Sequence, residues 1–205
     1  MNQNHVSFLK TDDEFGGLSN MAGGFPLLVN GVRVLTSEHL YQSLKFSNNP
    51  EIQKEVLKHG SPMRSKMVAR TGSNQNLIRP DWKEIQLDVM YFCLKVKLIW
   101  NWVSFGELLR STGSRDIFEI SSRKDRYWGV TITNDGFVGE NHLGKLLMKL
   151  RDELMEDDNR SLRVASAPEA LGLRLFGNDI RVIDRSSHLD QTGTRKSREV
   201  NQIRP

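Results

Sequence analysis

Residues 36–46 place an acid, a phenol, an amide and an amine on one face of a predicted helix. These side chains recur at i, i+3, i+4 and i+7, the spacing that aligns residues along a helix. The set comprises Glu38, Tyr41, Gln42 and Lys45. Such a face is either a solvated surface or the wall of a polar site. Residues 31–35 are predicted to form a strand that leads directly into the helix. This favours the interpretation that the face lines a polar site.

Lysine and carboxylate side chains on one helix face allow a specific chemistry. A buried lysine with a lowered pKa can attack an aldehyde-level carbon and form a Schiff base, while a nearby carboxylate moves protons. Thr36 is a good N-cap, so Glu38 falls in the first helical turn, where the helix dipole favours negative charge. A lone lysine is more often a solvated charge. Composition and spacing by themselves therefore predict an α+β domain and leave open whether it is an enzyme.

Metal and cofactor chemistry have little support in the sequence. The five histidines show no His-x-x-x-His spacing, and the single cysteine, Cys93, rules out a Cys-x-x-Cys pair. No Walker loop or Gly-x-Gly-x-x-Gly motif follows a predicted strand, and Gly16-Gly17 alone is a weak phosphate signal. We therefore expect neither a metal nor a cofactor.

The size and composition fit one globular domain. A chain of 205 residues can bury a proper core, and 38% hydrophobic with 26% charged residues is ordinary for such a domain. The apolar runs are too short to span a bilayer, and the N-terminus lacks the apolar stretch of a signal peptide. We expect no membrane partner and a cytoplasmic location.

Hydrophobic periodicity predicts a mainly helical α+β domain with a small β-sheet. The segment 27–35 reads as a hairpin around Asn30-Gly31, and residues 81–103 read as the longest helix and the core. Residues 72–79 are polar and loop-like. Further strands are expected at 6–9 and 126–132, and further helices at 36–46, 50–59, 61–70 and 143–155. Residues 105–109 and 116–120 are expected to be short elements of unassigned type.

The positive charge is concentrated in the C-terminal part. From Arg160 onward there are nine Lys/Arg and five Asp/Glu, a net of +4, so the first 159 residues are neutral. We predict a domain at 1–156 and a basic, partly disordered extension at 157–205. Residues 170–176 and 180–183 could dock on the body, and disorder is expected from about Ser186. Any electrostatic attraction to nucleic acid would come from this extension, and a solvated extension without such a contact is the favoured alternative.

Five ordered blocks resemble the YbiA-like or NADAR family of N-glycosidases, over about residues 5–155. The blocks are Phe15-Gly16-Gly17-Leu18-Ser19-Asn20, Thr36-Ser37-Glu38-His39 with Tyr41-Gln42 and Lys45-Phe46, Asp81-Trp82, Asp125-Arg126-Tyr127-Trp128-Gly129, and Asn141-His142-Leu143-Gly144 continuing to Arg151. Their order and compatible spacing make this resemblance far more specific than any single block.

The resemblance implies cleavage of the bond between ribose C1 and an exocyclic ring amine. The family's substrate types are ribosylamino-pyrimidine phosphates of riboflavin biosynthesis and ADP-ribose attached to guanine in nucleic acid. Such a ribosylamine can open to an imine, a lysine can take over C1 by transimination, and water then releases the sugar. This chemistry needs no metal and no cofactor.

The resemblance also implies a set of site residues. Glu38, Trp82 and Asp125 are expected to be essential, with Lys45 as the predicted Schiff-base amine. Glu38 would relay the ring-opening proton, and Asp125 would orient the ribose hydroxyls or protonate the leaving amine. Backbone N–H groups of 15–20 could hold a phosphate, and tryptophan rings could stack on a base. The predicted substrate-binding residues are Phe15, Gly16, Ser19, Asn20, His39, Gln42, Trp82, Tyr127, Trp128 and Asn141.

The sequence departs from the family pattern in places that bear on the substrate. Leu35 replaces a usual proline, Gln86 replaces a basic residue, and residues 130–140 are longer and less glycine-rich than in relatives. We expect the 130–140 stretch to shape the leaving-group side. Together with the basic extension it favours ADP-ribosyl-guanine in nucleic acid. The alternatives are a ribosylamino-pyrimidine phosphate, or a non-catalytic module that binds ADP-ribose or NAD.

Overall fold

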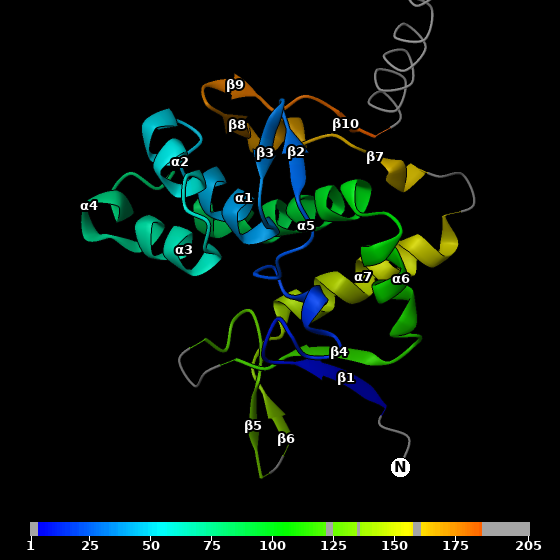
Figure 1. The fold of residues 1–205 in the computed structure, drawn as a ribbon. Coiled ribbons are helices and arrows are strands. Elements are labelled where there is room, and N and C mark those ends of the chain that lie inside the picture. Colours follow the sequence, from blue (N-terminus) through cyan, green and yellow to red (C-terminus); the bar gives the residue numbers. More distant parts are fainter. Residues whose placement is uncertain (1–3, 122–124, 135, 158–160, 186–205) are drawn as a thin grey trace, which may run out of the picture.

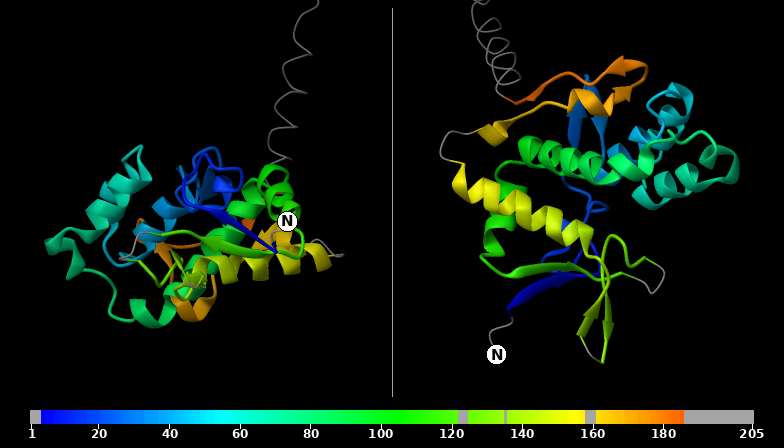
Figure 2. Two further views of the ribbon diagram at one scale, coloured as in Figure 1. Left: turned by 90° about the horizontal axis from the view of Figure 1, so that it is seen from below. Right: turned by 180° about the vertical axis from the view of Figure 1, so that it is seen from behind.

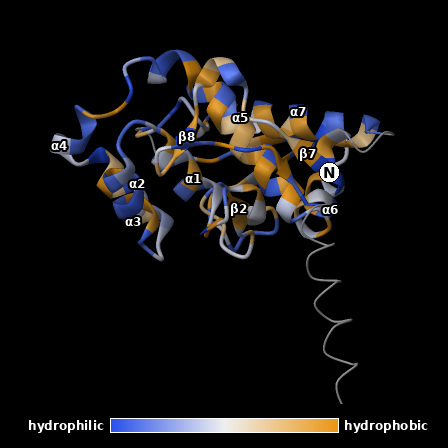
Figure 3. Ribbon diagram, turned by 90° about the horizontal axis from the view of Figure 1, so that it is seen from above, coloured by the Kyte–Doolittle hydropathy of each residue, from blue (hydrophilic) through white to orange (hydrophobic). Residues whose placement is uncertain are grey.

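The long helix α5 (Trp82–Trp100) is the axis of the structure, a computed structural model that describes residues 4–121, 125–134, 136–157 and 161–185. Other elements pack around it on two sides (Figure 1). Its apolar residues contribute to two core clusters, one on each side, and ten of its residues are buried. Figure 3 shows the resulting apolar surface along most of the helix. The predicted core helix is confirmed, although it ends at Trp100 rather than Val103.

One side of α5 packs against a hairpin and the helix that follows it. Strands β2 (Leu27–Val29) and β3 (Val32–Val34) pair in antiparallel register around Asn30 and Gly31. Both turn residues have positive φ (51° and 78°), as a two-residue hairpin turn requires. Helix α1 (Ser37–Leu44) follows directly and buries all eight of its residues. The predicted hairpin and helix are confirmed.

The other side of α5 carries α6 (Ser104–Ser111), α7 (His142–Glu156) and a parallel strand pair. Strand β1 (His5–Phe8) pairs with β4 (Asp116–Glu119), with Val6 opposite Ile117. The antiparallel hairpin of β5 (Thr131–Thr133) and β6 (Gly136–Val138) projects away from the body, as two views show (Figures 1 and 2). Among the described residues every β-sheet has two strands.

Three short helices form a third group beside α1. They are α2 (Pro50–Leu57), α3 (Pro62–Arg70) and α4 (Gly72–Gln75). Proline opens both α2 and α3, the position at which its missing N–H costs nothing. The prediction of a loop over 72–79 was therefore partly wrong. The strand predicted at 126–132 was also too long, because regular pairing begins only at Thr131.

Residues 161–185 fold back onto the body. This segment consists of short helices and strands. Five of its side chains belong to the core cluster that contains residues of α1 and α5: Ala165, Leu171, Leu173, Leu175 and Ile183. The elements are η2 (Ser161–Arg163), β7 (Val164–Ala165), η3 (Glu169–Leu171), β8 (Arg174–Leu175), β9 (Asn178–Asp179) and β10 (Ile183–Asp184). The docking expected for 170–176 and 180–183 is thus seen, and the disorder expected from Ser186 concerns residues outside the described part.

A buried lysine joins α5 to the glycine-rich turn at η1 (Gly16–Leu18). Lys97 is fully buried, and its Nζ donates hydrogen bonds to the carbonyl oxygens of Gly17 (2.6 Å) and Ser19 (3.0 Å). The amine also lies 4.6 Å and 4.3 Å from the ring centroids of Phe25 and Phe105. Burial lowers its pKa to about 7.

Lys97 should make the free energy of unfolding depend on pH. Its pKa is lower in the folded chain than its ordinary value of 10.5, so the unfolded chain binds more protons between pH 7 and that value. Stability should therefore rise with pH across this window. In Lys97→Met the free energy of unfolding should rise less steeply with pH. The difference in slope between the two proteins should approach that of one titrating proton when urea unfolding is measured from pH 7 to 10.

The matched control is Lys95→Met, because Lys95 lies on the same helix and is partly exposed. This variant should keep the wild-type slope. Equal slopes in wild type and Lys97→Met would contradict the assignment of a neutral, buried amine.

Candidate active site

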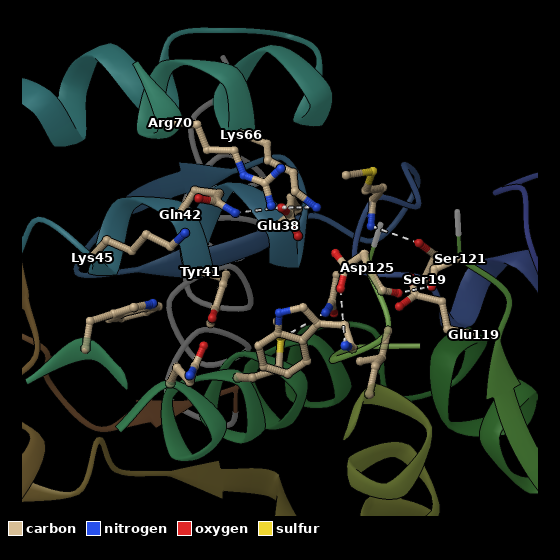
Figure 4. A pocket seen from close by; sticks show the side chains of 17 residues that line it. Ser19, Glu38, Tyr41, Gln42, Lys45, Lys66, Arg70, Glu119, Ser121 and Asp125 are labelled. Carbon is tan, nitrogen blue, oxygen red and sulfur yellow. Dashed lines mark hydrogen bonds and ion pairs between the residues drawn. The ribbon is translucent and has the colours of Figure 1, made fainter. Parts of the chain in front are cut away.

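A cavity of about 330 Å³ opens where α1, α3, the start of α5, the turn after η1 and the segment 119–128 meet. Figure 4 shows side chains from these elements converging on it. Among the lining residues, those that the sequence predicted are Ser19, Asn20, Glu38, Gln42, Lys45, Trp82, Asp125 and Trp128. Tyr41, recognised on the same helix face as Lys45, lines it as well.

Two caps fix the start of α1. The Thr36 Oγ1 accepts a hydrogen bond from the His39 N–H (3.3 Å), and the Asn20 carbonyl accepts one from the Glu38 N–H (3.0 Å). Both N–H groups would otherwise lack an intrahelical partner. The turn that contains Asn20 is therefore tied to the same helix turn that presents Glu38 to the cavity.

Glu38 is 95% buried and paired on two sides. Its Oε1 accepts a hydrogen bond from Gln42 Nε2 at 2.8 Å, one helical turn along. The Lys66 Nζ lies 4.0 Å from the same oxygen. A carboxylate removed from water needs such partners. The predicted i, i+4 alignment of this acid and this amide is thus a direct contact in the structure.

Lys45 presents a desolvated amine. Its Nζ lies 5.4 Å from the Tyr41 ring centroid and 5.6 Å from that of Trp82. Burial lowers its pKa to about 8; Glu38 acts in the opposite direction, while Arg70 and Lys66 lower it further. At pH 7 about a tenth of such an amine is unprotonated, compared with less than a thousandth at an ordinary lysine pKa.

Aromatic rings form the floor beside this amine. Tyr41 lies 5.0 Å from Trp82 and 5.6 Å from Trp128, measured between ring centroids. Burial also raises the pKa of Tyr41 far above its ordinary value, so its hydroxyl stays protonated. A planar ring system can stack against such a surface.

The opposite wall comes from β4 and the segment after it, which bring Glu119, Ser121 and Asp125 to the cavity. Burial raises the pKa of Glu119 to about 7; Glu38 and Asp125 raise it too, and Lys66 opposes them. Ser121 Oγ donates a hydrogen bond to the Asp125 carbonyl. Gly129 is required here, because a Cβ at that position would collide with the Glu119 carbonyl oxygen.

Five residues predicted to bind substrate do not line the cavity. The three in the first half of the chain have clear structural roles. Phe15 packs in the core cluster that contains β1 and α7, and Gly16 lies so close to the Lys10 carbonyl that no side chain fits. His39 is fully buried and bonds the Thr36 hydroxyl (2.8 Å) and the His59 carbonyl (2.9 Å).

The other two predicted residues, Asn141 and Tyr127, contact parts of the fold near Trp128 without lining the cavity. Asn141 precedes α7 in the left-handed region (φ 52°) and donates from Nδ2 to the Ile117 carbonyl at 2.8 Å. The Tyr127 ring lies 4.3 Å from His142 and 5.2 Å from Trp128. These side chains hold the fold here, and their expected contacts with substrate stay predictions. The described residues of the hairpin at 131–138 do not line the cavity either, and its expected role on the leaving-group side also stays a prediction.

Sequence reasoning missed several of the groups that matter here. Lys66 and Arg70 reach the cavity from α3, and Glu119 and Ser121 reach it from the end of β4. The spacing of Lys66 and Arg70 (i, i+4) was visible, but nothing in the sequence placed α3 beside α1. A charge count by segment gives a further signal, since residues 56–80 contain five Lys/Arg and no Asp or Glu.

Two of the lining residues have an amide oxygen without a partner in the described part of the chain. Asn20 Oδ1 and Gln42 Oε1 are buried without a hydrogen-bond partner, and both residues line the cavity. Unpaired buried oxygens of this kind are costly unless a ligand satisfies them. Among the described residues no group of His, Cys, Asp and Glu could hold a metal ion, and no helix is long and apolar enough to cross a membrane.

Comparisons with known proteins point to one family. The NADAR domain family matches residues 7–155. The N-glycosidase YbiA of Shigella boydii is 33% identical over 150 residues, which are 73% of this chain and 88% of that protein. The maize riboflavin biosynthesis protein PYRR is 33% identical over 175 residues, 80% of this chain and 27% of the longer protein.

The fold comparison agrees. The NMR structure of the E. coli protein YbiA superposes with a TM-score of 0.64 at 31% identity, covering 77% of this chain and 88% of that one. The predicted mainly helical α+β fold is thus confirmed by a solved relative.

Proposed function

This chain belongs to the NADAR domain family, and we propose that it is an N-glycosidase that releases ADP-ribose from the exocyclic amine of guanine in nucleic acid. The observation that carries the proposal is the position of Lys45: a desolvated amine with a pKa of about 8, in the same cavity as the buried carboxylate Glu38. A module that only bound ADP-ribose would have no need for this amine.

The reaction follows from these two groups. The ribosylamine opens to an imine between C1 and the base nitrogen. The unprotonated Lys45 amine adds to C1, the base leaves as its free amine, and Lys45 is left in an imine with the sugar. Water then adds to C1, releasing the sugar aldehyde and restoring the lysine. Glu38, held by Gln42, carries protons between these nitrogen atoms and water. Asp125 orients the ribose hydroxyls.

The α3 wall supplies the charge for a phosphorylated sugar. Lys66 and Arg70 extend from α3 toward the cavity above Glu38 and Gln42 (Figure 4). A guanidinium and an ammonium group are the usual partners of phosphate oxygens in proteins. We prefer this role to the phosphate contact expected from the backbone at 15–20, because the N–H groups of Gly16, Leu18 and Ser19 already donate to carbonyl oxygens of nearby residues.

Nucleic acid is favoured by the charge around this wall. Of the five Lys/Arg in residues 56–80, Lys58 and Arg79 pair with Glu55 and Asp81, and the other three, Arg64, Lys66 and Arg70, all lie on α3. Basic residues beside a site attract an anionic polymer over a distance of about a Debye length. The basic residues after Arg185 lie outside the described part of the chain. The attraction of nucleic acid is therefore assigned to α3 rather than to the extension.

The second candidate substrate is a ribosylamino-pyrimidine phosphate. The name of the maize relative, a riboflavin biosynthesis protein, favours it, and its single phosphate also suits Lys66 and Arg70. Both candidates present a ribosylated exocyclic amine on a pyrimidinone ring, so the proposed chemistry is the same for each.

Product analysis separates the two substrates. Incubation with DNA carrying ADP-ribose on guanine should release ADP-ribose and restore the unmodified base, as measured by mass spectrometry. A parallel incubation with the ribosylamino-pyrimidine phosphate should be slower at equal substrate concentration. Faster cleavage of the ribosylamino-pyrimidine phosphate would make it the preferred substrate. If neither substrate is cleaved, the proposed N-glycosidase activity is refuted.

Lys45 should be trapped as a sugar adduct. Borohydride added during turnover should reduce the imine and leave the sugar mass on the peptide that contains Lys45. Lys45→Arg keeps the positive charge but cannot form an imine, so adduct and turnover should both be lost, the latter by about a thousandfold or more. Lys54→Arg, a surface change on α2, is the control. Substantial turnover in Lys45→Arg, with no adduct in wild type, would instead indicate direct attack by water.

Lys66 and Arg70 should act on substrate binding. Lys66→Ala and Arg70→Ala should each raise KM by about tenfold or more with a smaller effect on kcat, because each removes a charge-assisted hydrogen bond to phosphate. Both effects should shrink for a substrate that lacks phosphate. Arg64→Ala, an exposed change on the same helix outside the cavity lining, is the control. An equal effect on phosphorylated and unphosphorylated substrates would contradict the assignment.

A further inference from the structure

The cavity has two chemically different ends. Figure 4 shows Lys45 at one end, while Ser19, Ser121 and Glu119 gather at the other, with Glu38 and Asp125 between. The cations Lys66 and Arg70 approach the part of the cavity beside Glu38 rather than the end with the serines. If the reacting C1 lies near Lys45 and the phosphates near α3, the serine end remains for the base.

Glu119 is held rigidly at this end. Its backbone lies opposite Phe8 in the parallel β1–β4 pair, and its carbonyl accepts a hydrogen bond from the Val130 N–H at 2.8 Å. Its side chain makes no hydrogen bond or ion pair with any other residue in the described part of the chain. A half-buried carboxyl on a fixed strand, lining a cavity and without a partner, is available for a ligand.

A third polar side chain lines the cavity next to Ser19. Asn20 follows Ser19 in the turn, is only 4% exposed, and its Oδ1 has no partner among the described residues. Together with the Ser19 and Ser121 hydroxyls this gives a set of neutral hydrogen-bonding groups around one carboxyl. Such a set suits an uncharged, planar, polar ring better than a phosphate.

We propose that Glu119 is the residue that recognises the base, by pairing with an adjacent ring N–H and C=O. Guanine presents this amide edge as N1–H and C6=O, next to the 2-amino group. The inference rests on the proposed function, because it takes the base to be the leaving group whose amine faces Lys45. It assigns Glu119 to substrate selection, a role separate from the proton transfers of Glu38.

Two hydrogen bonds define the proposed pairing. A protonated carboxyl donates from its O–H to the ring carbonyl, and its own carbonyl oxygen accepts from the ring N–H. A carboxylate held against this edge keeps only the second contact and repels the ring carbonyl, unless a neighbouring 2-amino group offers it a second N–H. The raised pKa of Glu119, about 7, keeps a large fraction of it in the protonated form near neutral pH. The charged groups facing it are Glu38 on α1, Lys66 on α3 and Asp125 in the segment after β4.

A glutamine at this position imitates the protonated acid, since its amide also offers one donor and one acceptor side by side. This makes Glu119→Gln a diagnostic substitution. A residue that donates a proton during catalysis would lose its function on changing to glutamine. A residue that binds the ring N–H and C=O would keep its function as glutamine, and ligand binding would lose only its dependence on pH.

The test measures binding of two nucleosides, inosine and purine riboside, to the full chain by calorimetry. Inosine presents the N1–H and C6=O without a 2-amino group, and purine riboside has neither group, so a protonated carboxyl makes two hydrogen bonds with the first and one with the second. At pH 6 the wild type should bind inosine about tenfold more tightly than purine riboside. At pH 8 its affinity for inosine should fall several-fold. Glu119→Gln should keep both the preference and the affinity for inosine at both pH values, and Glu119→Ala should lose the preference at both.

Glu107→Gln, an exposed change on α6, is the control and should behave as the wild type. A preference for inosine over purine riboside that survives in Glu119→Ala would overturn the inference. So would a Glu119→Gln variant with unchanged nucleoside binding and pH dependence but a large loss of kcat, since that result makes Glu119 a proton donor. Because the readout needs no turnover, a Glu119-dependent preference in a protein that cleaves neither ribosylated substrate would refute the proposed function alone.

Discussion

The buried amine of Lys97 is the constraint on which the site depends. It reaches from the central helix α5 to the Gly17 and Ser19 carbonyls, and so fixes the turn between η1 and the β2–β3 hairpin. The next residue, Asn20, offers its carbonyl to the Glu38 N–H at the start of α1. The central helix therefore positions the turn, and the turn positions the helix end that presents Glu38. An amine lowered in pKa by burial is well suited to this task, because it keeps its donors without requiring a counter-charge.

The cavity gathers charges that would be more stable apart. Three carboxyl groups and three cations line a volume of about 330 Å³, and burial shifts the pKa of one member of each set toward neutrality. Lys45 falls to about 8 and Glu119 rises to about 7. Both shifts mean that the folded state disfavours the charged form, which is a cost in stability. Such opposed shifts in one cavity are typical of sites that handle protons, and they are hard to explain as packing.

Local features of the sequence predicted the fold well. The hairpin turn at Asn30-Gly31, the N-cap at Thr36 and the apolar periodicity of α5 each depend on neighbours within a few residues. The helix face with Glu38, Gln42 and Lys45 was predictable for the same reason. Lys66 and Glu119 were not, because their presence in the cavity depends on how α3 and β4 pack against α1. His39 and Asn141 misled for the converse reason: their polar side chains satisfy backbone groups that only the folded chain brings near.

The order of groups along the cavity bears on how the proposed substrate would lie in it. Asp125 would repel phosphate oxygens, while Lys66 and Arg70, beside Glu38, would attract them. In the proposed mechanism, a base at the Lys45 end would displace the carbon that the amine attacks. One orientation satisfies both conditions, with the sugar between the carboxylate of Glu38 and the amine of Lys45. Under these proposals the acid that serves the reaction and the acid that faces the base are separated by position, even though both are glutamates in one cavity.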